Sequence, residues 1–153
     1  MRLAEERPDG FQCENWLLDS AIPWKKRGRI SWEDLCLLEQ QPESLWINGS
    51  SSIGGINNRI SVGRQEEISN SLALIRVDAV EISGDNYVHF QYMGSYYAIN
   101  LTDPVYEERM RAKGYSRQRL GESFITVSLG KEWHGYFYKF AAAIIERTEI
   151  ESG

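Results

Sequence analysis

A succession of short strand-like runs in the second half of the chain constrains the fold most. Turn residues separate runs rich in β-branched and aromatic residues, which lie at 72–77, 79–82, 88–93, 96–101, 124–129 and 136–145. In one run Val88, Phe90 and Tyr92 alternate with polar positions, so these three side chains are expected on one face of a sheet. Gly94-Ser95 between two such runs predicts a tight hairpin. The pattern indicates a mostly β fold.

Two short helices are expected among the strands. Ser31 followed by Asp34 resembles a capping box, and the apolar spacing that follows predicts a helix over about residues 32–40. Asp103-Pro104 has the N-cap and first-turn residues of a second helix, and Gly114 lies past its end. The segment 130–135 joins the last two strand-like runs as a turn or loop. The sequence therefore predicts a mostly β, barrel-like domain with two short helices, with an α+β domain as the alternative.

The chain of 153 residues and 17.6 kDa is long enough for one domain with a real core. Residues 1–10 are polar and charged and are expected to form a flexible N-terminal segment, residues 11–146 a single domain, and residues 147–153 a flexible tail. The longest apolar run, Phe140 to Ile145, is far shorter than a membrane span, and the N-terminus lacks an apolar signal core. We expect a cytoplasmic protein without membrane association.

The residues that usually carry catalysis or bind metals are sparse. Cys13 and Cys36 lie far apart without metal-ligand spacing, and His89 and His134 fall in separate segments. Adjacent acids such as Glu66-Glu67 point in different directions on a regular element and do not form an acid/base pair. The sequence therefore predicts a non-enzymatic protein with no metal and no cofactor.

The charge is negative overall but unevenly distributed. A net charge of −5 argues against a general polyanion binder, because Lys and Arg contacts to phosphate supply most non-specific affinity for nucleic acid. Two short basic stretches stand out nevertheless: Lys25, Lys26, Arg27 and Arg29 in one, and Arg109, Arg111, Lys113, Arg117 and Arg119 in the other. A local positive face would favour a defined anionic ligand.

The first basic stretch, flanked by Trp24 and Trp32, is the strongest candidate site from the residues alone. Its cations could hold phosphates while an indole stacks on a base, as in proteins that bind single strands. The alternative is that both tryptophans anchor the core and the cations only solubilise a loop. About half of the second stretch lies at the C-terminal end of a predicted helix, where the helix dipole alone favours cations. The Ser-, Gly- and Asn-rich segment 48–58 is expected to be a loop, and it lacks the Gly-Lys-Ser/Thr ending of a phosphate-binding loop.

Several strings occur in an order that is similar to one known family. They are Gln12-Cys-Glu-Asn-Trp-Leu-Leu-Asp19, Pro23-Trp-Lys, Gly28-Arg-Ile-Ser-Trp32, Ser44-Leu-Trp-Ile-Asn-Gly49, Asn57-Asn-Arg59, Ser71-Leu-Ala-Leu-Ile75, Thr102-Asp-Pro104, Val127-Ser-Leu-Gly130, Gly135-Tyr-Phe-Tyr-Lys139 and Ala142-Ala-Ile-Ile145. Together they resemble the dual OB-fold domain of bacterial and phage-associated proteins.

This resemblance implies a small antiparallel barrel that binds nucleic acid or a nucleotide-like anion, with no catalytic residues to carry over. It favours Arg59, with Tyr96 and Tyr97, as ligand-contacting positions. Members of the family begin with further strands ending in a Trp-Ile-Arg-Pro-like string, and nothing similar precedes Phe11 here. Uncovered strand edges would then predict a homo-oligomer or a fold completed by a partner. The alternative function is a protein-interaction module, for example an accessory or inhibitory factor in phage–host conflict.

Overall fold

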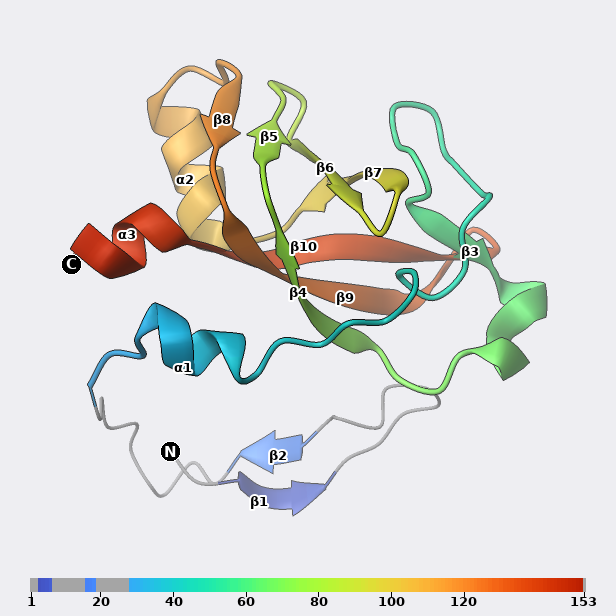
Figure 1. Cartoon of the computed structure of the whole chain (residues 1–153). Coiled ribbons are helices and arrows are strands. Elements are labelled where there is room, and N and C mark those ends of the chain that lie inside the picture. Colours follow the sequence, from blue (N-terminus) through green and yellow to red (C-terminus); the bar gives the residue numbers. More distant parts are fainter. Residues whose placement is uncertain (1–2, 7–15, 19–27, 153) are drawn as a thin grey trace.

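The computed structural model describes residues 3–6, 16–18 and 28–152, and the side chains of residues 28–152 (Figure 1). Its strands are β1 (Leu3–Glu6), β2 (Trp16–Leu18), β3 (Arg59–Ser61), β4 (Leu72–Val77), β5 (Val80–Ile82), β6 (Tyr87–Tyr92), β7 (Ser95–Leu101), β8 (Gln118–Leu120), β9 (Ser123–Trp133) and β10 (Tyr136–Glu146). Its helices are α1 (Trp32–Cys36), α2 (Pro104–Ala112), α3 (Arg147–Ser152) and the 3-10 helix η1 (Val62–Glu67). The mostly β prediction is confirmed.

Eight of these strands form one sheet, in the order β4-β9-β10-β7-β6-β5-β8, with β3 paired to the first part of β10. The pairs are antiparallel except β10 with β7. The sheet is not closed into a barrel, which corrects the prediction. Closure would need β4 and β8 to pair, but β8 has only three residues and pairs with β5. On the outer edge of β4, Leu74 instead bonds to Gln40, through Gln40 N–H to Leu74 C=O at 2.8 Å and Leu74 N–H to Gln40 Oε1 at 2.7 Å.

Two hairpins use the same kind of two-residue turn. Met93-Gly94 joins β6 to β7, one position earlier than predicted, and His134-Gly135 joins β9 to β10. All four residues have positive φ, as in the primed turns that match the twist of antiparallel strands. Consequently β9 continues to Trp133, through most of the segment 130–135 that the sequence predicts to be a turn or loop.

The core lies on the inner face of the sheet and follows the predicted alternation. The central cluster includes Ile75, Ile82, Val88, Phe90, Tyr97, Ile99, Ile125 and Val127, all at most 2% exposed. Full burial of each large apolar side chain stabilises the fold by about 1.5–3 kcal/mol. A second cluster joins Ile60, Ile68, Leu129 and Phe137 near β3. This second cluster therefore packs beneath β3 and the turn end of the β9–β10 hairpin.

The helices begin at their predicted caps but differ in extent. Ser31 Oγ accepts a hydrogen bond from Asp34 N–H at 3.1 Å, and α1 ends at Cys36 rather than near residue 40. Asp103 caps α2 and also accepts from Ile144 N–H at 2.9 Å. The sequence does not predict η1, and it predicts a flexible tail where α3 forms. In α3, Arg147 forms ion pairs with Glu122 at 2.7 Å and with Glu151 at 2.6 Å.

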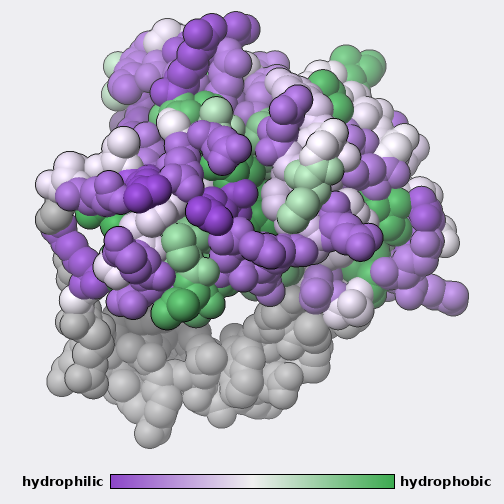
Figure 2. All heavy atoms as spheres, viewed as in Figure 1, coloured by the Kyte–Doolittle hydropathy of each residue, from purple (hydrophilic) through white to green (hydrophobic). Residues whose placement is uncertain are grey.

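At the N-terminus, part of the segment predicted to be flexible is a strand. Residues Leu3–Glu6 pair with Trp16–Leu18 as an antiparallel two-stranded sheet, separate in hydrogen bonding from the main sheet. Within the described part of the chain, no helix combines the length and apolar character needed to cross a bilayer. The face in Figure 2 is mostly hydrophilic, with hydrophobic residues in small separate areas.

Candidate ligand-binding surface

Arg59, at the start of β3, carries an available positive charge on the sheet surface. Its guanidinium carbon lies 3.8 Å from the centre of the Tyr136 ring, a cation–π arrangement. Its Nε donates a hydrogen bond of 3.2 Å to Ser50 Oγ. No carboxylate among the described residues pairs with Arg59, so its two terminal nitrogens can still donate to an anion.

Aromatic rings continue from Arg59 toward the turn between β9 and β10. The ring centres of Tyr136 and Tyr138 lie 6.3 Å apart, those of Tyr138 and Trp133 5.8 Å apart, and those of Trp133 and His134 4.1 Å apart, all edge to face. Trp133 is 63% exposed. We call these five residues (Arg59, Trp133, His134, Tyr136 and Tyr138) the Arg59 cluster. It combines exposed ring surface with one cation.

Strand alternation and the tight turn place these side chains together. In β10, Phe137 and Lys139 are buried beneath the sheet, so Tyr136 and Tyr138 lie on the other face. Tyr138 pairs across the strands with Arg59, and Tyr136 with Trp133. The sequence analysis missed Trp133, Tyr136 and Tyr138 as site residues. The alternation Tyr136, Tyr138 against Phe137, Lys139 is the signal that could have found them.

The predicted loop at 48–58 is confirmed, and it packs beside the cluster with many internal hydrogen bonds. The Asn58 side chain, 1% exposed, donates to Ser52 Oγ at 2.7 Å and accepts from Ser52 N–H at 2.9 Å. Asn57 accepts from Gly49 N–H at 2.8 Å and donates to the Tyr96 carbonyl oxygen at 3.0 Å. The loop is thus held by its own hydrogen bonds, leads into β3 and is hydrogen-bonded to β7 through Asn57 and Tyr96.

A comparison of the chain with protein-family models agrees with the β-rich fold described above. The model of the dual OB-containing domain matches residues 1–144, which is most of the chain. The chain belongs to this family. Searches of curated proteins and of solved structures found no match. Although the family's name refers to the OB fold, the described strands of this dual OB-containing domain form an open sheet.

The structure separates the site residues that the sequence predicts for this dual OB-containing domain. Arg59 and Tyr96, which is 41% exposed, reach the surface and are connected through the 48–58 loop. Tyr97 is fully buried and stacks on Phe90 with ring centres 5.3 Å apart. Trp32 is 3% exposed and packs against Phe124 at 4.9 Å. Neither buried ring offers a face to a ligand, because each fills the apolar core, and this corrects their assignment.

The first basic stretch lies mostly outside the described residues. Trp24, Lys25, Lys26 and Arg27 all precede residue 28, whereas Arg29 is described and exposed. The structure therefore leaves that candidate as a prediction.

Most of the second basic stretch is engaged with carboxylates. Arg109 pairs with Glu149 at 2.6 Å, Arg111 with Glu108 at 2.8 Å, and Arg117 with Glu81 at 2.8 Å. Lys113 donates to Gln118 Oε1 at 2.9 Å. Arg119 is exposed and has no carboxylate partner within residues 28–152. Among the described residues, glutamates thus neutralise three of the five cations of this stretch, and Lys113 and Arg119 lie on the surface without a carboxylate partner.

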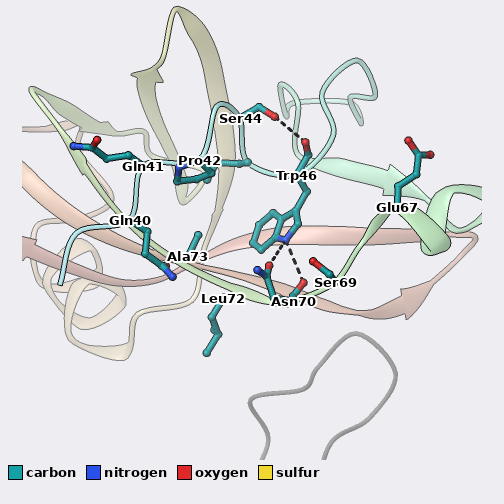
Figure 3. Close-up of a pocket in the computed structure, with 11 residues that line it drawn as sticks. Gln40, Gln41, Pro42, Ser44, Trp46, Glu67, Ser69, Asn70, Leu72 and Ala73 are labelled. Atoms are coloured by element: carbon teal, nitrogen blue, oxygen red, sulfur yellow. Dashed lines mark hydrogen bonds between the residues drawn. The ribbon is translucent and has the colours of Figure 1, made fainter.

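Two pockets lie elsewhere on the domain. One, of about 300 Å³, borders the outer edge of β4, and Trp46 forms one wall of it (Figure 3). The Trp46 indole donates to Asn70, to Oδ1 at 2.8 Å and to the carbonyl oxygen at 3.2 Å. The other, of about 330 Å³, lies beside His89 and Tyr96 and includes Arg119. In that pocket the His89 ring nitrogens contact the Ser83 hydroxyl at 3.0 Å and the Tyr96 hydroxyl at 3.3 Å.

Metal ligands do not gather in the described part of the chain. No group of three or more His, Cys, Asp or Glu side chains there is arranged to hold a metal ion. Cys36 is a free, half-buried cysteine at the end of α1.

Proposed function

We propose that this domain binds nucleic acid or a nucleotide-like anion through the Arg59 cluster, without catalysis. The observation that carries the proposal is the stacking of the Arg59 guanidinium on Tyr136 beside the exposed Trp133. Bases stack on exposed aromatic rings, and a guanidinium free of carboxylates binds phosphate. Membership in an OB-containing family supports the same class of ligand.

The distribution of charge on the domain supports binding of an anion at a defined site rather than non-specific attraction of polyanions. The chain has a net charge of −5, and most described arginines outside the cluster are neutralised by glutamates. A polyanion would therefore be repelled from much of the surface and attracted to Arg59, which adjoins aromatic rings and pairs with no carboxylate of residues 28–152. Single-stranded nucleic acid fits this surface better than a duplex, because its bases are open to stacking.

The direct test measures binding of fluorescently labelled single-stranded DNA and RNA oligonucleotides at several salt concentrations. Affinity should fall as salt rises, with a log–log slope of about −0.7 per phosphate neutralised. Arg59→Gln should weaken binding and reduce the magnitude of that slope by about 0.7. Trp133→Ala should weaken binding by about 1–3 kcal/mol if the indole stacks on one base.

The matched controls are substitutions of an arginine and of an exposed aromatic residue that lie outside the Arg59 cluster. Arg111→Gln removes the same charge from α2, where the guanidinium is paired with Glu108, and should change binding little. Tyr115→Ala removes a ring that is 47% exposed outside the cluster. Absence of oligonucleotide binding at low salt, or equal losses in Arg59→Gln and Arg111→Gln, would contradict the proposal.

A second candidate function, a protein-interaction module, is favoured by the edge of β4. Leu74 N–H and C=O point to the outer edge and bond to Gln40. Since backbone groups alternate along a strand, those of Leu72 point to the same edge, beside the Trp46 pocket (Figure 3). An extended peptide could pair there. Leu72→Pro would block such pairing, and its effect on partner binding separates this function from that of the Arg59 cluster.

A further inference from the structure

Lys139 is a fully buried lysine that pairs with no carboxylate of the described residues. Its side chain is 0% exposed, on the inner face of β10. Nζ donates to the Ile47 carbonyl oxygen at 2.9 Å and lies 3.4 Å from Asn48 Oδ1. Burying a charged amine costs several kcal/mol unless it is paired, so such a position requires an explanation.

The same residue holds both ends of the loop beside the Arg59 cluster. The side chain bonds the start of the loop at Ile47 and Asn48, and the Lys139 backbone N–H donates to the Asn58 carbonyl oxygen at 2.9 Å. Arg59 follows directly after Asn58 and donates to Ser50 inside the loop. The loop that Lys139 contacts at both ends therefore contains a hydrogen-bond acceptor of the Arg59 guanidinium.

We propose that Lys139 is a positioning residue for the Arg59 cluster, and that uptake of a proton by its side chain favours release of the 47–58 loop. This inference rests on the proposed function of the cluster. It requires that Lys139 binds a proton more weakly when the loop is closed over it than when the loop is open.

The surroundings of Lys139 support that difference. Tyr97 from β7 is the titratable group in contact, with its ring centre 5.3 Å from Nζ. The loop contributes only neutral oxygens, from Ile47 and Asn48, and the β9 residue opposite Lys139 is the apolar Leu129. Burial lowers the pKa of Lys139 to about 7 from its usual 10.5.

The direction of the effect follows from these two pKa values. Between pH 7 and 10.5 an open loop binds more protons than a closed one, so closure strengthens as pH rises through this range. At the steepest part the opening equilibrium should change about tenfold per pH unit. Below pH 7 both forms are protonated, and the dependence should level off.

Amide hydrogen exchange tests the inference without any ligand. The N–H groups of Gly49, Ser52 and Asn57 are bonded within the loop and report its opening. Their protection factors, corrected for intrinsic exchange at each pH, should rise from pH 6.5 to 8.5 in the wild type. Val105 N–H, bonded to Asp103 at the start of α2, is the internal reference.

Two variants make the test specific to Lys139. Lys139→Met keeps the length of the side chain without a titrating group and should remove the pH dependence of loop protection. Asn48→Asp places a carboxylate beside Nζ, which should raise the proton affinity of Lys139 and flatten the dependence below pH 8.5. The second variant keeps the lysine, so the test stands even if Lys139→Met fails to fold.

Three outcomes would overturn the inference. They are loop protection in the wild type that does not change with pH, an equal pH dependence in Lys139→Met, and an equal dependence in Asn48→Asp. Oligonucleotide affinity provides the connection to function: the ratio of affinities at pH 8.5 and 6.5 should be higher in the wild type than in Lys139→Met. If the proposed function fails, oligonucleotides do not bind at all while the exchange result stands, so the two failures are distinguishable.

Discussion

The Tyr97 hydroxyl accepts a hydrogen bond of 3.1 Å from the backbone N–H of Leu45, which lies 52 positions earlier in the chain. Both residues are buried, at 0% and 1% exposure. Leu45 belongs to the segment that leads from α1 toward the 48–58 loop, so this bond fastens the segment to β7 in the core. A tyrosine that the sequence analysis assigned to ligand binding is instead a structural anchor.

Tyr97→Phe should therefore lower the free energy of unfolding. The substitution leaves a buried N–H without an acceptor, which costs about 1–3 kcal/mol. Urea denaturation followed by circular dichroism measures the change. Tyr115→Phe, at an exposed ring, is the control and should leave stability within about 0.5 kcal/mol of the wild type. Equal effects of the two variants would contradict the anchoring role.

Trp32→Ala tests the reassignment of Trp32 from the binding site to the core. Loss of a buried indole packed against Phe124 should cost about 3–5 kcal/mol of stability. If the variant still folds at low temperature, its oligonucleotide affinity should match that of the wild type. A stable Trp32→Ala protein with weakened binding would restore the original prediction.

Gly55→Ala should disrupt the loop beside the Arg59 cluster. A Cβ atom at Gly55 would lie 2.2 Å from Asn58 Nδ2, so the buried Asn58 side chain would have to leave its bonds to Ser52. Overpacking and the lost bonds together should cost about 1–3 kcal/mol. Gly63→Ala is the matched control, since its Cβ would meet Ser61 Oγ at an ordinary 3.7 Å. Thermal unfolding compares the two, and equal melting temperatures would argue against tight packing at Gly55.

The attachment of α3 should weaken at acid pH. The hydrogen bond from Arg147 lowers the pKa of Glu122, with a smaller contribution from Arg76. The folded-state pKa lies below the unfolded value, so this stabilisation is present above the ordinary glutamate pKa and is lost as pH falls through the folded value. Because the pair is partly exposed, its contribution should be about 1 kcal/mol or less. Denaturation of Arg147→Gln at pH 3 to 6 should show a shallower loss than the wild type, and parallel curves would contradict this.

The sequence predicted the strands of the sheet better than its closure. The strand around Phe90 was predicted from the alternation of apolar and polar residues, which a sheet with one core face imposes directly, and the strand around Ile125 from its run of β-branched and aromatic residues. Closure depends instead on which edges meet, and the contact of Gln40 with Leu74 is a pairing between segments 34 positions apart. Composition and periodicity contain no information on such a contact.

The binding surface was predicted only in part for a similar reason. Arg59 and Tyr96 were named, but Trp133 and Tyr136 fell in or beside a predicted turn or loop. Their placement depends on His134 adopting positive φ, which is uncommon for a residue other than glycine. Lys139 was missed because lysine is rarely buried, so no sequence rule assigns it to a core position.

An open sheet can in principle grow by adding copies of itself, since each edge displays donors and acceptors that suit another chain. At Leu74 of β4, Gln40 already forms such bonds, because its main chain and its side-chain amide together take the place of one residue of a neighbouring strand. An incoming chain would have to displace Gln40 before it could form its own hydrogen bonds with Leu74. A chain that pairs with β4 therefore either displaces Gln40 at Leu74 or stays at the Leu72 end of the edge, beside the Trp46 pocket.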